Sequence, residues 1–141
     1  MKRLLAIIAL LVGCGPASAG VLTCSFTEPF FTITFDSATG VVTWVSADEA
    51  DVDTGEIKPR VIAENARLRR SDVWEGHETY FLESDVETIL TLKVNGRGSD
   101  GMSEMVFPFE GISGGRSGGC ESDKAPAYDM YEVFLDLGAK E

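Results

Sequence analysis

Apolar and polar residues alternate along most of the chain after residue 20, with the two-residue period of β-strands. Val21–Phe26 is short and rich in strand-forming residues, and Phe31–Phe35 alternates apolar with hydroxyl side chains. Val41–Val45 resumes the pattern after Asp36–Gly40, a run of turn residues that ends in glycine. We therefore predict three strands here, the last two joined as a hairpin with Trp44 on one face.

The middle of the chain continues this rhythm with one interruption. Ser46–Glu56 is acidic and short of large apolar residues, so we predict an exposed loop. Arg60–Leu68 is ambiguous, because its alanines and glutamate favour helix while its surroundings favour a β-meander, and we prefer strand. His77–Glu83 and Val86–Val94 alternate again, and Asn95–Gly96 is typical of a turn.

The last part of the regular pattern is a strand at Met105–Phe109, followed by what we interpret as a glycine-rich bend over Gly111–Gly119. About six to eight short strands with frequent turn signals are typical of an antiparallel barrel or sandwich. We therefore predict a mainly β domain over residues 20–122, small and antiparallel.

The segment 123–141 departs from the strand pattern. Ala127, Met130, Phe134 and Leu137 can be aligned at helical spacing, so a C-terminal helix packed on the domain is one interpretation. An edge strand over Tyr131–Leu137 is the other, and periodicity leaves both open.

The first nineteen residues have the pattern of an export signal. Lys2 and Arg3 precede an apolar run over Leu4–Gly13, and Ala17-Ser18-Ala19 supplies a small-residue cleavage site. The run has roughly half the length of a membrane-spanning helix, so we expect no transmembrane span. Cleavage after Ala19 predicts a periplasmic or secreted protein of the bacterial envelope.

A second processing route is also open. Leu11-Val12-Gly13-Cys14 fits the pattern that is cut before an acylated cysteine, which would make residues 1–13 a lipoprotein signal and Cys14 a lipid anchor to an envelope membrane. Either route leaves Cys24 and Cys120 as the remaining cysteines. We predict that these two form a disulfide, as expected in an oxidising compartment, with two separate buried thiols as the alternative.

The charge of the chain narrows the possible partners. The formal net charge is −11, and it becomes −13 when Lys2 and Arg3 are removed with the signal. Such a surface repels phosphate backbones, so we expect no nucleic-acid partner, whereas basic proteins and cationic peptides are attracted. Solubility is the simpler explanation of the same charge.

Catalytic and metal-binding patterns are weak. A hydrolase would need Glu28, Asp100 and Glu104 to come together as an acid and base pair, which the sequence alone cannot show. His77 lies in a polar stretch and is interpreted as a surface residue. The acidic loop fails the calcium-loop pattern, because Thr54 stands where glycine is needed and Arg60 where the bidentate glutamate is needed. We expect no enzymatic activity, no metal and no cofactor.

Two motifs resemble those of a family of small, largely uncharacterised exported bacterial proteins. The first is the run Cys24–Phe31, with the sequence Cys-Ser-Phe-Thr-Glu-Pro-Phe-Phe. The second is Ser99–Glu104, Ser-Asp-Gly-Met-Ser-Glu, followed by Phe107-Pro108-Phe109 and by Gly118-Gly119-Cys120. The resemblance covers the mature chain through about Cys120.

This resemblance implies an uncharacterised exported protein, and some relatives are similar to the small acidic β-barrel inhibitors of vertebrate-type lysozyme. The chain departs from the family at Phe31, where tryptophan is usual, at Glu104, where aspartate is usual, and at Gly98, where cysteine is frequent. The last departure prevents the family's disulfide pattern from being copied, so the pairing of the two cysteines rests on counting.

The motif residues are our candidates for ligand or partner binding. They are Glu28, Phe30, Phe31, Asp100, Met102 and Glu104. Each also has a structural interpretation: the Glu28 carboxylate can cap nearby amides, Asp100 can stabilise its own turn, and Met102 can plug the barrel end. We predict a non-catalytic module that binds a protein or small ligand in the cell envelope. The alternatives are an inhibitor of a basic wall-degrading enzyme such as lysozyme, and a glycan-directed hydrolase.

Overall fold

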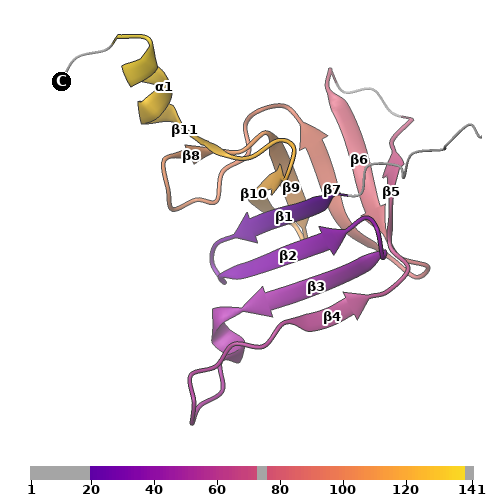
Figure 1. The fold of residues 1–141 in the computed structure, drawn as a ribbon. Helices are drawn as coiled ribbons and strands as arrows, with labels where there is room; N and C mark the ends of the chain where they lie inside the picture. Colours follow the sequence, from indigo (N-terminus) through magenta and orange to yellow (C-terminus); the bar gives the residue numbers. More distant parts are fainter. Residues whose placement is uncertain (1–19, 73–75, 139–141) are drawn as a thin grey trace, which may run out of the picture.

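The computed structural model describes residues 20–72 and 76–138, and within them β-strands dominate (Figure 1). Nine strands of this part form one antiparallel sheet in the order β4-β3-β2-β1-β10-β9-β7-β6-β5. The strands of the sheet are β1 (Val21–Phe26), β2 (Phe31–Asp36), β3 (Val41–Ser46), β4 (Arg60–Ala63), β5 (Arg67–Arg70), β6 (Glu78–Glu83), β7 (Thr88–Val94), β9 (Phe109–Ser113) and β10 (Arg116–Ser122). The predicted mainly β class is confirmed.

The sheet curls strongly and forms a half-barrel, in which β1–β4 make one wall and β5–β7 the facing wall (Figure 1). Its two edge strands, β4 and β5, follow each other in the chain and are joined by Glu64–Ala66. The Ala66 N–H donates to the carbonyl oxygen of Gly40 at 2.9 Å, which holds this connection against the β2–β3 turn. The segment that the sequence left ambiguous, Arg60–Leu68, therefore holds a strand and the start of the next one.

The core lies on the concave face of the half-barrel. Leu22, Cys24 and Phe26 of β1 are buried at every second position, as the alternation predicts. Their cross-strand partners on β2 are Phe35, Ile33 and Phe31, so the same face continues from strand to strand. The core also contains the buried residues Val42, Ala66, Leu82, Ile89, Leu90, Leu92 and Cys120.

The predicted disulfide is confirmed. Cys24 on β1 and Cys120 on β10 are direct cross-strand partners with their Cα atoms 4.0 Å apart, and their sulfurs are bonded. Gly111 on β9 lies beside the bridge, where a Cβ atom would be 2.4 Å from the Sγ of Cys120. The bridge therefore occupies space that a side chain would otherwise take.

The predicted glycine-rich bend over Gly111–Gly119 is wrong. This segment is a hairpin of β9 and β10, and Gly114 and Gly115 alone form its turn. Because glycine weakens strands in general, composition pointed to a bend. The structure shows that the strand glycines are needed where bulky groups approach the backbone.

An aromatic ring packs directly against each of two of these glycines. A Cβ on Gly118 would lie 2.6 Å from the ring of Phe26, and a Cβ on Gly119 would lie 2.4 Å from the ring of Phe107. Neighbouring residues of a strand point to opposite faces, so Phe26 packs on the concave side and Phe107 on the outer side. Phe107 is buried there, outside the main core.

The end of the chain forms a separate small unit. β11 (Tyr128–Asp129) pairs with β8 (Met105–Val106), and the helix α1 (Met130–Asp136) follows directly. The helical interpretation of this segment is the one observed, but α1 contacts β11 and lies away from the nine-stranded sheet, so its predicted packing on the domain is not seen among the described residues (Figure 1). Neither α1 nor the short 3-10 helix η1 (Ala47–Glu49), the helices of the described part, has the length and apolarity to cross a bilayer. The predicted signal segment 1–19, with Cys14, lies outside the described residues.

Candidate functional site

The two motifs, about seventy positions apart in the sequence, meet in the structure. Gly101 has a positive φ of 76°, and a Cβ atom there would lie 2.6 Å from the Oγ1 of Thr27. The turn at residues 99–103 is therefore packed directly against the segment that links β1 to β2. This contact brings Asp100 and Met102 to one cleft with Phe30 and Phe31.

We call this site the Phe30–Met102 cleft. Its volume is about 310 Å³, and Ser25, Thr32 and Val45, which are cross-strand neighbours on β1, β2 and β3, contribute to its lining. These three alternate with the core residues of their strands, so the cleft lies on the outer face of the sheet. Ile57, which follows the acidic loop, is also part of the lining.

The cleft exposes large apolar side chains to solvent. The exposed fractions are 47% for Phe30, 42% for Ile57 and 70% for Met102. A scattered exposed apolar residue needs no explanation, but three that line one hollow form a patch of the kind found at interaction sites.

A stack of aromatic rings supports the cleft from the core side. The rings of Phe26 and Phe31 are stacked with centroids 4.5 Å apart, and Phe31 continues to Trp44 at 5.9 Å. Phe31 and Phe26 line the cleft and also pack in or against the core. The inner part of the cleft is therefore built on rings that also belong to the core packing.

Asp100 uses its carboxylate to hold its own turn. Oδ1 accepts hydrogen bonds from the backbone N–H groups of Met102 and Ser103 at 2.9 and 2.8 Å, and Oδ2 accepts one from the Ser103 hydroxyl at 2.7 Å. Burial raises the pKa of Asp100, but these hydrogen bonds outweigh burial and leave the pKa below its ordinary value. The group is thus held as an anion, which suits attraction of a cation and not donation of a proton.

Glu28 has an unusual backbone conformation, with a φ of 56° in the left-handed region that non-glycine residues rarely adopt. Its carbonyl oxygen accepts a hydrogen bond from the guanidinium group of Arg116. The bond to Arg116 engages the main chain, and the Glu28 side chain is exposed. The residue therefore shapes the connection before Phe30 through its backbone.

The remaining candidates lie elsewhere or behave differently. Glu104 lines another hollow, together with Arg97, Tyr128 and Met130, so it does not share the Phe30–Met102 cleft with Asp100. The alternative structural role of Met102, plugging the barrel end, does not fit its largely exposed side chain.

The acidic loop carries no cluster of metal ligands. Asp51 accepts hydrogen bonds from the N–H groups of Asp53 and Thr54, both at 2.9 Å, and these bonds lower its pKa. Among the described residues, no group of three or more histidine, cysteine, aspartate or glutamate side chains is placed to hold a metal ion.

Gly98, where the resembling family often has cysteine, has no room for a side chain. A Cβ atom there would lie 2.0 Å from the carbonyl oxygen of Phe109 and 2.8 Å from the Cβ of Phe107. Gly98 instead forms an isolated β-bridge with Phe107, with two backbone hydrogen bonds. A cysteine, and so a second disulfide, at this position would require a different local backbone.

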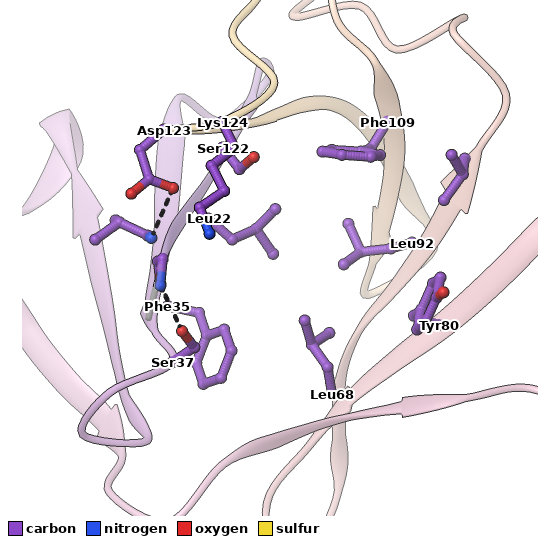
Figure 2. Close-up of a pocket in the computed structure, with 13 residues that line it drawn as sticks. Leu22, Phe35, Ser37, Leu68, Tyr80, Leu92, Phe109, Ser122, Asp123 and Lys124 are labelled. Atoms are coloured by element: carbon purple, nitrogen blue, oxygen red, sulfur yellow. Dashed lines mark hydrogen bonds between the residues drawn. The ribbon is translucent and has the colours of Figure 1, made fainter. Parts of the chain in front are cut away.

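Sequence reasoning missed a cavity at the other end of the half-barrel (Figure 2). Leu22, Phe35, Leu68, Tyr80 and Leu92 contribute to its lining, and its volume is about 260 Å³. The alternating pattern marks several of these residues as facing inward, but no signal in the sequence indicates that they leave a space between them.

Comparison with known proteins gives no relative: no protein family, no curated protein sequence and no solved structure matches the chain. The resemblance to the small exported bacterial family thus rests on the motif residues alone. The function must be argued from the geometry described above.

Proposed function

We propose that the protein is an exported, non-catalytic binding module of the bacterial envelope, whose partner docks on the Phe30–Met102 cleft. The observation that carries this proposal is that two distant motifs converge to expose Phe30 and Met102 over a base of stacked aromatic rings. Aromatic and methionine side chains that are exposed in the free protein and seated on a firm base are typical anchors of protein interfaces.

The charge around the cleft indicates a basic partner. The Asp100 carboxylate lies in the cleft as an anion, and the acidic loop that contains Asp48 and Glu56 leads directly into Ile57. The net charge of −13 after signal removal would steer a cationic protein toward this surface. A basic wall-degrading enzyme such as lysozyme has this chemistry.

The start of the fold supports export and cleavage after Ala19. β1 begins at Val21, and the N–H of Gly20 donates to the Ser37 hydroxyl at 2.7 Å. The Asp123 Oδ1 lies 2.9 Å from the Cβ position of Gly20, so an amino terminus created at Gly20 would have a carboxylate beside it. A disulfide in the core also suits an oxidising compartment.

Lipid attachment at Cys14 is the alternative form of export. It would leave residues 15–19 between the lipid and Gly20. The intact mass of the protein from its native host distinguishes the two, because acylation adds the mass of the lipid to a chain that begins at Cys14.

The hydrolase alternative has less support. A carboxyl group that donates a proton near neutral pH needs a raised pKa, and the pKa of Asp100 is lowered. Glu104, its supposed partner, lines a separate hollow.

The test is a binding titration of the mature protein, residues 20–141, with vertebrate-type lysozyme and with a cationic amphipathic peptide. We expect binding that weakens as salt rises, and a loss of tenfold or more in affinity for Phe30→Ala or Met102→Ala. The control is Val86→Ala, which removes an even more exposed apolar side chain (89% exposed) from the β6–β7 turn, outside the cleft.

Equal losses in the cleft variants and in the control would refute the cleft as the docking surface. Binding that is independent of Phe30 and Met102 but sensitive to salt would leave only nonspecific attraction by the acidic surface. Melting temperatures of all variants show whether the fold is retained.

A further inference from the structure

The cavity at the far end of the half-barrel is a second site, separate from the Phe30–Met102 cleft (Figure 2). Leu22, near the start of β1, lines the cavity, whereas Phe26, at the end of the same strand, lines the cleft. Four residues of a strand span about 13 Å, and the two sites have no lining residue in common. A ligand in the cavity would therefore not compete with a partner in the cleft.

The cavity presents hydrocarbon to its interior. Leu22, Phe35, Leu68, Leu92 and Phe109 come from five different strands and converge on it (Figure 2). A ligand group inside needs no hydrogen-bonding capacity, and a polar group there would lose its hydration without compensation.

The hydroxyl group of Tyr80, at the wall of the cavity, is already hydrogen-bonded. It donates to the Glu78 carboxylate at 3.1 Å, and the same carboxylate accepts from Arg70 at 3.0 Å. The Tyr80 ring therefore acts as part of the apolar lining.

The volume sets the size of the ligand. An apolar cavity of about 150 Å³ is known to hold benzene, with six carbon atoms. By proportion, the 260 Å³ of this cavity corresponds to roughly ten carbon atoms. This is the size of a medium-length aliphatic chain and too small for a long-chain lipid tail to be enclosed.

The mouth of the cavity sets the head group. The Asp123 carboxylate accepts a hydrogen bond from the Val21 N–H at 3.3 Å. The Ser37 hydroxyl accepts a hydrogen bond from the Gly20 N–H and donates one to the Gly20 carbonyl oxygen. Lys124 is exposed and also lines the cavity, so it supplies positive charge at the mouth (Figure 2). An anionic head group is the one that this lysine would stabilise.

We propose that the cavity binds a medium-chain fatty acid of about ten carbons, with the aliphatic chain between the two walls of the half-barrel and the carboxylate at Lys124. The apolar lining selects the chain, the volume limits its length, and the lysine orients the molecule. This site goes beyond the partner docking proposed above and stands independently of it.

The test is calorimetric titration of the mature protein with straight-chain fatty acids of six, eight, ten and fourteen carbons, all below their micelle concentrations. We expect one site per chain, with affinity that rises about fourfold per methylene up to about ten carbons and then stops rising. Val94→Trp, which places an indole at a cavity-lining position, should reduce decanoate affinity at least tenfold.

Matched controls separate the cavity from general effects. Val61→Trp introduces the same side chain at an exposed position of β4 outside the cavity and should leave affinity unchanged. Leu68→Trp, on the edge strand β5, fills the cavity by a second route if Val94→Trp does not fold. Lys124→Gln should weaken decanoate roughly two- to fivefold but not 1-decanol, and Lys58→Gln should change neither.

Absence of saturable decanoate binding would overturn the proposal. It would also be overturned if both tryptophan variants in the cavity bind decanoate as well as the wild type, or if affinity continues to rise to fourteen carbons. Equal effects of Lys124→Gln on decanoate and 1-decanol would refute the assigned position of the carboxylate.

Discussion

Removal of the bridge between Cys24 and Cys120 should be the most destabilising change that leaves the folded contacts nearly intact. The two residues are 96 positions apart, so the bridge closes a ring that contains most of the described domain. Loss of such a cross-link increases the entropy of the unfolded chain by an amount worth about 4.7 kcal/mol at 25 °C. The entropy of unfolding for a domain of this size is about 0.25 kcal/mol per kelvin, so the melting temperature should fall by roughly 15–20 °C.

The measurement is urea unfolding followed by circular dichroism, on oxidised wild type, reduced wild type and the variant in which both cysteines are alanine. Reduced wild type keeps both sulfurs in the core, so its difference from the oxidised protein reports the cross-link, and its difference from the alanine variant reports lost packing. A difference of less than 1 kcal/mol between oxidised and reduced wild type would refute the reasoning. That result would mean that the unfolded chain gains little freedom when the bridge is opened.

Three further predictions follow from close contacts and from one hydrogen-bonded turn. Gly111→Ala should lower the free energy of unfolding by about 1–3 kcal/mol in the wild type, because the new Cβ would lie 2.4 Å from the Cys120 sulfur. The loss should be much smaller in the variant without the disulfide, and urea unfolding in both backgrounds measures the difference. Gly118→Ala should cost at least about 2 kcal/mol in both backgrounds, since it meets the Phe26 ring and strand backbone, and the same unfolding curves measure it. The pKa of Asp100 is lower in the folded protein than its ordinary value of about 3.9, so the ionised carboxylate stabilises the fold above that pH. This contribution is lost as pH falls through the lower folded pKa. Asp100→Asn should therefore lose less stability than wild type between pH 5 and pH 2, as measured by thermal melts.

Each of these expectations has a result that contradicts it. Equal costs of Gly111→Ala with and without the bridge would mean that the sulfur is not the obstacle. Full tolerance of Gly118→Ala would show that the Phe26 ring can move aside. Identical acid profiles of wild type and Asp100→Asn would show that the turn contributes nothing to the pH dependence.

Local patterns predicted the strands and their buried faces. Leu22, Cys24 and Phe26 alternate with less buried residues, and this period of two is a property of the strand itself, independent of its neighbours. Cysteine counting predicted the disulfide, because the two cysteines that remain after the predicted signal have one pairing available when they are oxidised. The candidate residues Phe30 and Met102 were named from their motifs, although the sequence did not show that they share a cleft.

The glycines of β10 illustrate what local reasoning misjudged. Gly118 and Gly119 weaken a strand when considered alone, which is why a bend was predicted. In the folded protein, Phe26 and Phe107 occupy the space above them, one on each face. This compensation comes from residues distant in the sequence, so only the assembled sheet shows it.

The sequence by itself determined the mainly β class and the alternation that places Leu22 and Phe26 inside, and it favoured a disulfide between the two cysteines. The tertiary structure alone decided that Thr27 meets Gly101 and that the half-barrel leaves an apolar cavity at one end. The physical reason is the range of the interactions. Strand formation and side-chain direction follow from neighbouring residues, whereas register, curl and unfilled volume depend on how remote strands pair and how far the sheet closes.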